Sequence, residues 1–379
     1  MNNHNCNVVN MKRLSVQYLV ILCLSLFMVS CHEGNYYDAI PRGSIALVQV
    51  SPDADSKQFS AIGLFLGTKD LAGAGIDTDS PVYLFESPDG NLGVCAKVSS
   101  SSDLEDFVGA MNKKGEATAV KERKGCKFSL IRKSFLLAFN DEAMVAVGPV
   151  LASSESELVG RLSRYLELDP ERGAGSDEMF ATLSESKDNI TLVAKAIAMP
   201  KQFVAPFLLG TPAGTSASDV TVTASVEVGD SVLTLNGATS SPNLNIQQAM
   251  DRSRAIFGKL SAEDFADSES SPMVIYVNAK GEDIVNLMKT NKDLSQILAT
   301  GSFRNKLSAS NGPMAITLKN SKGTTGDAAY SADVVVLTGA QSVEGKTLRV
   351  VLNVKTVGPE VLQMLSPFLS GISKIVYQQ

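Results

Sequence analysis

The chain has 379 residues, 44% of them hydrophobic and 20% charged, which is the composition of a folded globular protein and excludes a disordered stalk. Its formal net charge of −6 counts against nucleic acid as a partner. The two histidines, His4 and His32, stand near the start of the sequence, so the remainder offers no histidine for nucleophilic catalysis or a transition-metal site, and we predict no cofactor.

The N-terminus has the pattern of a bacterial lipoprotein signal. Two basic residues, Lys12 and Arg13, precede an apolar run that ends in Val29-Ser30-Cys31, an order typical of a secretory signal. The uninterrupted apolar part of the run is shorter than the roughly 20 residues that a membrane-spanning helix needs. We therefore predict that residues 1–30 are a signal peptide and that Cys31 becomes the lipidated N-terminus.

The predicted anchor indicates the outer membrane, with the body facing the periplasm or the cell surface. Several acyl chains on Cys31 give stable attachment to a membrane. His32 follows Cys31, where enteric lipoproteins that stay in the inner membrane carry an acidic residue. Removal of the signal peptide takes away two basic residues and no acid, which changes the net charge from −6 to −8. Translation from Met11 is an alternative to Met1, because residues 1–10 carry no positive charge.

A short segment, residues 31–41, connects the predicted anchor to the body. It contains Tyr36-x-x-Ala39-Ile40-Pro41, and Ser44–Val50 then alternates apolar and polar residues as a strand does. This start of the mature chain resembles a family of Gram-negative lipoproteins of unknown function. The resemblance implies a lipoprotein and implies no activity.

Residues 42–168 predict an N-terminal α+β domain. A hairpin over 81–98 is expected, because Pro88-Asp89-Gly90-Asn91 supplies turn residues. Ser102-Asp103-Leu104-Glu105 predicts a capping box at the start of a helix that ends at Gly115. An antiparallel meander and a further helix follow, over 126–132, 135–140, 143–147 and 154–166.

Pro, Gly and charged residues cluster at Asp169–Ser176, which predicts a domain boundary. The C-terminal domain, 169–379, repeats the order β-α-β-β-α, with a further break near 259–271 if it holds two units. Hairpin patterns dominate, so the predicted fold class is α+β, with antiparallel sheets and helices packed on one face. Strands are expected at 190–198, 220–228, 232–238, 273–278, 314–318, 332–337 and 348–354, and helices at 200–209, at 243–257, from Gly281 and from Pro359.

Two cysteines, Cys95 and Cys126, remain beside the lipidated Cys31 in an oxidising compartment. A disulfide between them would close a loop of about 30 residues and stabilise the fold by roughly 3 to 4 kcal/mol. In the predicted strands, however, Cys126 shares a face with Phe128, whereas Cys95 shares one with Lys97. The sequence leaves the bond open.

Positive charge is concentrated between residues 113 and 133 of an otherwise acidic protein. The basic residues of this segment are Lys113, Lys114, Lys121, Arg123, Lys124, Lys127, Arg132 and Lys133. We predict a docking patch at Lys121, Arg123, Lys124 and Lys127 for an anionic envelope component, such as a lipopolysaccharide phosphate, or for an envelope protein. The alternative is that the lysines protect an exposed strand edge from unwanted pairing.

Three short motifs resemble functional sites without the context that those sites need. Gly345-Lys346-Thr347 lacks the spacing of a phosphate-binding loop and precedes a strand pattern instead of a helix. Ser184-Glu185-Ser186-Lys187 has the Ser-x-x-Lys of penicillin-recognising enzymes without their Lys-Thr-Gly element. Asp77-Thr78-Asp79 is not continued by the Gly and Glu of a calcium loop. We expect turns and chance matches here.

The sequence therefore predicts a non-enzymatic envelope lipoprotein that binds or supports other components at the outer membrane. The alternative is a hydrolase that uses paired carboxylates or the pair Ser184 and Lys187, because two of the 40 acidic residues suffice for acid–base chemistry once folding brings them together. An enzyme should show a deep pocket with converging groups of shifted pKa, and a scaffold should not.

Overall fold

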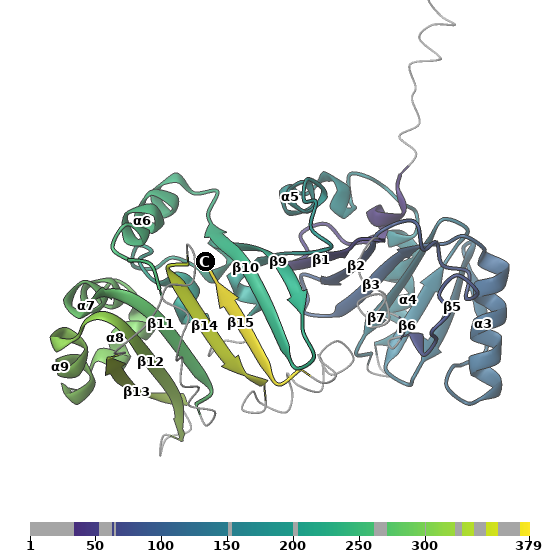
Figure 1. Ribbon diagram of the computed structural model, residues 1–379. Helices are drawn as coiled ribbons and strands as arrows, with labels where there is room; N and C mark the ends of the chain where they lie inside the picture. The colour runs from purple at the N-terminus through teal and green to yellow at the C-terminus, as the bar shows by residue number, and fades with distance from the viewer. Residues whose placement is uncertain are drawn as a thin grey trace, which may run out of the picture. The chain divides into compact units, whose positions relative to one another are not determined.

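The fold is organised around one long β-sheet in the computed structural model (Figure 1). Its strands are β1 (Ala46–Val50), β2 (Val82–Glu86), β3 (Leu92–Lys97), β4 (Lys121–Arg123), β5 (Cys126–Ile131), β6 (Phe135–Phe139), β7 (Ala143–Gly148), β8 (Ile190–Lys195), β9 (Thr221–Val228), β10 (Val232–Ser240), β11 (Met273–Lys280), β12 (Asn311–Lys322), β13 (Ala328–Val336), β14 (Leu348–Asn353) and β15 (Lys374–Gln378). They hydrogen-bond in the order β13-β12-β11-β14-β15-β10-β9-β8-β1-β2-β3-β7-β6-β5-β4. Every neighbouring pair is antiparallel except β10 and β15, which are parallel.

The structure describes residues 34–52, 63, 66–150, 154–199, 204–260, 271–299, 301–322, 328–336, 346–354 and 372–379. The predicted signal peptide, Cys31 and the helix predicted from Pro359 lie outside these residues. So does most of the break predicted near 259–271.

Helices fill the connections between strands. The α-helices are α3 (Ser101–Lys113), α4 (Glu155–Tyr165), α5 (Glu178–Ser184), α6 (Leu244–Arg254), α7 (Gly281–Lys289), α8 (Lys292–Leu298) and α9 (Gly301–Ala309), and the 3₁₀ helices are η1 (Tyr36–Ala39), η2 (Ala174–Ser176), η3 (Ala196–Ala198), η5 (Ala205–Leu208) and η6 (Ala217–Asp219). None of the helices in the described part of the chain has the length and hydropathy that crossing a membrane requires.

The predicted α+β class is confirmed, with a single continuous sheet where the sequence predicted separate ones. β1 and β8 come from the two predicted domains, yet they pair over the whole length of β1, from Ala46 opposite Ala194 to Val50 opposite Ile190. Residues Asn35–Gln379 form one unit. The sheet continues across the boundary predicted at Asp169–Ser176. The limits of the two predicted domains stay predictions.

The first half of the sheet consists of β1 to β7, and the second half of β8 to β15. The predicted hairpin and meander are both found in the first half. In the turn between β2 and β3, Ser87 donates from Oγ to Asp89 at 2.6 Å, and Gly90 has a φ of +79°. The sequence did not predict β4, which joins β5 through Lys124 and Gly125, both at positive φ. Positive φ at both central residues is what a type I′ hairpin turn requires.

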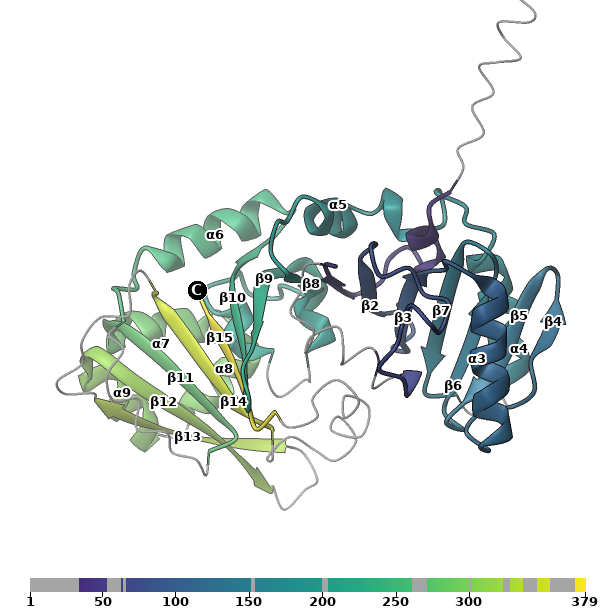
Figure 2. The same ribbon diagram turned by 45° about the vertical axis from the view of Figure 1, so that its right-hand side comes forward.

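Helices pack on both faces of this half, whereas the sequence predicted one face. α3 covers one face with Leu104 and Val108, and α4 and α5 cover the other with side chains such as Leu162 and Phe180. Figure 2 shows α3 lying along the strands of this half. The reason for two layers of helices is that every residue of β7 is buried, and a strand apolar on both sides needs cover on both.

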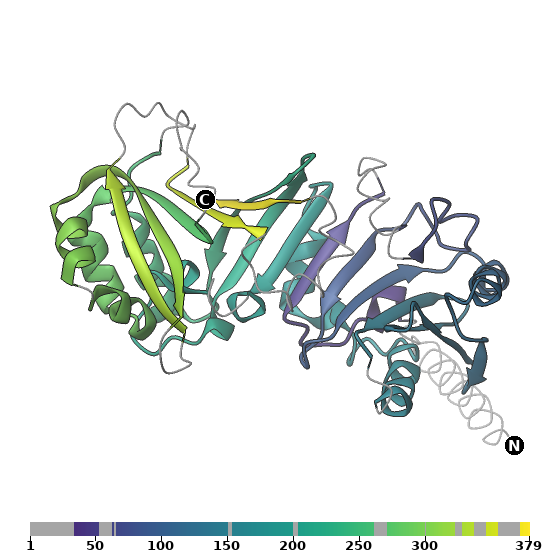
Figure 3. The same cartoon turned by 90° about the horizontal axis from the view of Figure 1, so that it is seen from below.

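In the second half, α6 to α9 cover one face of the sheet. Met250, Met288 and Phe303 of these helices pack on strand residues such as Ile275 and Val350. Figure 3 shows the green helices α7–α9 together on one side of β11–β13. The sequence did not predict α5, α8, α9 or β15. The helix predicted over 200–209 is, in its described residues, only the 3₁₀ helix η5.

The first turn of α3 begins earlier than the predicted capping box. Ser100 is the N-cap, and its Oγ accepts a hydrogen bond from the backbone N–H of Asp103 at 3.2 Å. Ser102 lies inside the helix. Glu105 does not reach back to the cap, because its carboxylate pairs with Lys127 at 2.6 Å.

We predict that Ser100→Ala lowers the free energy of unfolding by about 1 kcal/mol, because the amide of Asp103 loses its cap. Ser156→Ala removes the same hydroxyl from an exposed position within α4 and should change the free energy by less than about 0.5 kcal/mol. Urea unfolding followed by circular dichroism measures both. Equal losses would contradict Ser100 as the cap.

Candidate functional site

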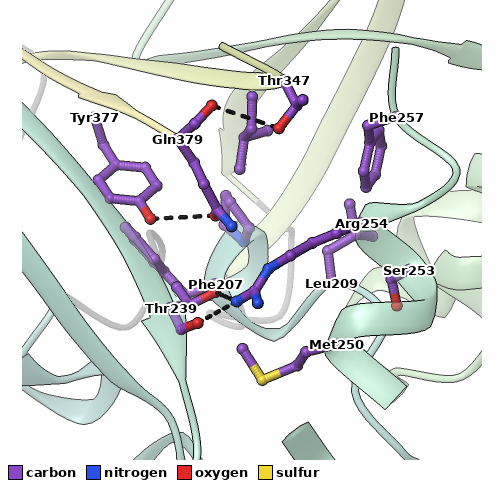
Figure 4. A pocket seen from close by; sticks show the side chains of 12 residues that line it. Phe207, Leu209, Thr239, Met250, Ser253, Arg254, Phe257, Thr347, Tyr377 and Gln379 are labelled. Atoms are coloured by element: carbon purple, nitrogen blue, oxygen red, sulfur yellow. Dashed lines mark hydrogen bonds between the residues drawn. The ribbon is translucent and has the colours of Figure 1, made fainter. Parts of the chain in front are cut away.

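A small pocket lies in the second half of the sheet, between η5, the C-terminal part of α6 and the strands β10, β14 and β15 (Figure 4). Its cavity volume is about 40 Å³, which is room for about three water molecules. Phe207 of η5 packs edge-on against Tyr377 of β15, with the ring centroids 5.1 Å apart. Met250 and Phe257 add further apolar wall.

Arg254, in the last turn of α6, has the one charged side chain among the described residues that line the pocket. Its Nη2 donates to the carbonyl oxygen of Thr239 and, at 3.0 Å, to the Oγ1 of Thr239. Its Nη1 donates to the carboxylate of Asp251 at 2.9 Å. The guanidinium therefore ties α6 to β10.

The other polar side chains of the pocket are held in the same way. The hydroxyl of Tyr377 donates to the side-chain oxygen of Gln379 at 3.3 Å, and Ser253 donates to the carbonyl of Gly210 at 3.2 Å. Burial raises the pKa of Tyr377, so this phenol stays protonated. The lining side chains that the structure describes include no carboxylate or imidazole to act as a base.

A second cavity, of about 30 Å³, shares Pro206, Leu209 and Leu348 with the first. Its other walls include Met288 of α7 and Ile297 of α8, which belong to the core of this half. Both cavities are far smaller than the roughly 300 to 1,000 Å³ of typical ligand pockets. They are gaps in a packed core, and Arg254 lines the first of them.

The structure divides the predicted basic patch between the two faces of the sheet. Lys121 lies opposite Phe128 and Arg123 opposite Cys126, so both point to the face that α4 and α5 cover, because paired residues share a face. Lys127 lies opposite Phe139 and points to the face of α3. Lys124 occupies the turn between β4 and β5.

Lys127 is paired with an acid. Its Nζ lies 2.6 Å from Oε2 of Glu105 and 5.9 Å from the ring centroid of Phe139. The hydrogen bond to Glu105 raises the pKa of Lys127, so this cation connects α3 to β5. The remaining charges lie on or beside β4, whose three residues are exposed at the edge of the sheet. That position favours the alternative of edge protection.

Cys95 and Cys126 are both free and buried. The strands β7 and β6 lie between β3 and β5, so three spacings of about 4.8 Å separate the two thiols, beyond the Cα–Cα limit of about 7 Å for a disulfide. The predicted difference in strand face was wrong, because both thiols belong to one apolar cluster. The sequence left the Cys95–Cys126 disulfide open. The distance between their strands excludes it, although both side chains lie on the same face of the sheet.

The predicted Ser-x-x-Lys pair lies at the end of α5. Ser184 donates to the carbonyl of Ala181 at 2.9 Å, as a serine in the last turn of a helix commonly does. Ser186 accepts a hydrogen bond from Thr191 at 2.6 Å, and Lys187 is exposed. These residues shape the turn before β8 and lie outside the pocket of Figure 4.

The two other motifs also form local structure. Asp77 accepts a hydrogen bond from the amide of Asp79 at 2.8 Å and pairs with Lys97 at 3.2 Å. Thr347 is followed by β14, in agreement with the predicted strand. Within the ranges that the structure describes, no three His, Cys, Asp or Glu residues are placed to hold a metal ion.

The segment that follows Cys31 is docked into the fold, a feature that the sequence did not predict. Ala39 and Ile40 are fully buried, and Asp38 is 4% exposed. The carboxylate of Asp38 accepts hydrogen bonds from the amide of Asn35 at 2.9 Å and from the amide of Gly175 at 3.2 Å. A Cβ at position 175 would lie 2.5 Å from this carboxylate, so only glycine fits there.

Aromatic rings hold the same segment from the other side. Tyr37 packs on Phe180 of α5 at 4.7 Å between centroids, and Tyr36 lies 6.0 Å from Tyr83 of β2. The hydroxyl of Tyr36 donates to the carbonyl of Pro81 at 2.8 Å, and the Sγ of Cys95 donates to the carbonyl of Tyr36 at 3.3 Å. The sequence gives no signal for this docking, because Asp38 and Gly175 are 137 residues apart.

Comparison with known proteins gives a family and no activity. A family model described as a domain of unknown function (DUF4836) matches residues 63–326. No curated protein matches the chain.

Three crystal forms of TP0453 are similar to the chain in structure. Form IV has a TM-score of 0.32 and 11% identity and covers 52% of this chain and 77% of its own. Form I has a TM-score of 0.32 and 12% identity, with coverage of 58% and 86%. Form III has a TM-score of 0.31 and 12% identity, with coverage of 61% and 89%. Similarity of this degree carries no functional inference.

We predict that Cys95 and Cys126 both react as free thiols when the protein is alkylated in denaturant without reductant. In the native protein Cys95 should resist alkylation, because it is fully buried beneath Tyr36 and burial raises its pKa. Tyr36→Ala should make Cys95 reactive by loosening the docked segment. Tyr165→Ala removes the same atoms from α4 and should leave Cys95 protected; mass spectrometry of the labelled peptides distinguishes the two.

Proposed function

The chain belongs to the DUF4836 family, whose function is unknown, and from that premise we propose that it is a lipid-anchored, non-enzymatic protein of the Gram-negative cell envelope. The lipid is carried by Cys31, at the end of the signal sequence, and holds the body at the outer membrane. The body binds or supports other envelope components.

The docked position of Tyr36–Ile40 is the observation that carries this proposal. Cys31 precedes Asn35 by four residues, which span at most about 14 Å when fully extended. The folded body thus begins almost at the predicted lipid. A lipid on Cys31 would restrain the nearby segment Tyr36–Ile40. Because Ala39 and Ile40 are buried in the body, the lipid would also hold the body close to the membrane.

The polar groups of the pocket support a binding or structural role. Arg254 is engaged by Thr239 and Asp251, and Tyr377 by Gln379. A catalytic group must lie within hydrogen-bonding distance of a substrate, whereas these groups are bonded to one another, and the bond from Arg254 to Thr239 joins α6 to β10. The alternative, a hydrolase with paired carboxylates or with Ser184 and Lys187, has in its favour only that these residue types occur.

We predict that Cys31→Ser abolishes incorporation of labelled lipid and moves the protein from the membrane fraction to the soluble fraction. Cys126→Ser, which changes a thiol to a hydroxyl inside the body, is the matched control and should leave both properties unchanged. Immunoblots of fractionated cells and metabolic lipid labelling provide the measurements. Unchanged membrane association of Cys31→Ser would refute the anchor.

The hydrolase alternative has a separate test. The mature chain can be screened against ester, amide, glycoside and phosphoester substrates, and the non-enzymatic proposal expects no turnover. Turnover that one Asp or Glu substitution, or Ser184→Ala, abolishes without unfolding the protein would establish the alternative.

A further inference from the structure

Four basic residues gather where α3 ends and where β5 turns into β6. Lys113 and Lys114 close α3, and Arg132 and Lys133 form the turn. The two places are adjacent, because the amide of Arg132 donates to the carbonyl of Glu116 at 2.7 Å and Ala117 forms a β-bridge with Ile131. We call these four residues the cationic end.

The cationic end differs from the basic patch predicted from the sequence. All four of its residues are exposed, and none of the ion pairs found among the described residues involves them. Lys127, by contrast, is paired with Glu105. Glu116 is the one acid in the two segments 113–116 and 131–134, so these segments together carry a net charge of +3.

The backbone of the turn formed by Arg132 and Lys133 is strained. Arg132 and Lys133 have φ values of +50° and +59°, in the left-handed region where residues with a Cβ are strained. The amide of Ser134 donates to the carbonyl of Ile131 at 3.1 Å, so both residues are central to a tight turn that favours Asn-Gly. Long cations at strained positions point to a role other than stability.

Arg132 is also positioned from a distant part of the chain. A Cβ at Gly67 would lie 2.6 Å from the Nη2 of Arg132, so the guanidinium lies directly against the backbone of Gly67. The φ of Gly67 is +78°, a second reason for glycine there. The side chain of Arg132 is therefore placed, and does not simply extend into solvent.

We propose that the cationic end binds the phosphate groups of anionic lipid headgroups at a membrane surface. Such a surface attracts clustered Lys and Arg residues through their charge. A protein partner would need apolar anchors at the centre of the contact, and the large exposed hydrophobic residues of the described chain, Ile197, Val228, Leu244 and Val336, all lie in the second half of the sheet.

The position of the cationic end agrees with the anchor proposed at Cys31. The start of β6 pairs with the end of β7, the end of β7 with the start of β3, the start of β3 with the end of β2, and the end of β2 with the start of β1. The Arg132-Lys133 turn therefore lies at the strand ends where the chain enters β1 from the docked segment. This one argument rests on the anchor; the attraction between the cationic end and an anionic membrane does not.

The test uses the mature chain, residues 31–379, with Cys31→Ser so that no lipid is attached. Sedimentation with phosphatidylcholine vesicles is compared with sedimentation with vesicles that also contain phosphatidylglycerol. We expect binding to the anionic vesicles only, and a loss of binding as salt is raised. Equal binding to both kinds of vesicle, or binding to neither, would overturn the proposal; binding to neither would leave the anchor at Cys31 unaffected.

Two matched variants locate the site. Lys113→Gln, Lys114→Gln and Lys133→Gln together remove three charges from the cationic end, and Lys121→Gln, Arg123→Gln and Lys124→Gln remove three from β4 and its turn. Each cation lost from the cationic end should lower the partition coefficient by about fivefold, whereas the second variant should bind as the unchanged protein does. Equal losses in both variants would mean that net charge alone is responsible and would refute the site.

A third variant separates binding from folding. Arg132→Asn with Lys133→Gly gives the turn its preferred residues, so we expect a higher midpoint of thermal unfolding together with weaker binding to the anionic vesicles. A more stable protein that binds the vesicles as tightly as before would contradict the role of Arg132 and Lys133.

Discussion

The ladder between β1 and β8 is the interaction on which the rest of the structure depends. Each of these strands has its other partner in its own half, β2 or β9, so without the ladder the sheet would be two sheets with two new edges. α5 packs on both strands, and the loop before it, Asp169–Ser176, receives η1. One junction thus joins the halves of the molecule and fixes the segment that follows Cys31.

Turns and helix ends could be predicted from the sequence, whereas the pairing and burial of the strands could not. The turn at Pro88–Asn91 and the helix end at Gly115 come from the φ values that those residues permit, and both are found. β4 has only Lys-Glu-Arg and becomes a strand through β5. The phase of Cys95 was misjudged for a related reason: four consecutive residues of β3 are buried, and a strand covered on both faces has no alternation to read.

The candidate sites could likewise be predicted only in part. Clustering of cations between residues 113 and 133 is visible in the sequence, but register and side-chain partners decide which of them stay available. Lys127 meets Glu105 of α3, and Arg132 meets Gly67. The docking of Asp38 likewise depends on Gly175, 137 residues away. Contacts at such separations arise only from the folded sheet, so no spacing rule within the sequence reports them.

The place of β15 has a consequence for how the chain folds. β15 lies between β10 and β14, and its Gln378 meets Asn236, 142 residues earlier. Contacts closed over so long a loop form slowly. Until β15 is in place, β14 and β10 each present an open edge, at which a second molecule can pair. Association of two chains is second order and closure by β15 is first order, so dilution during folding favours the native sheet.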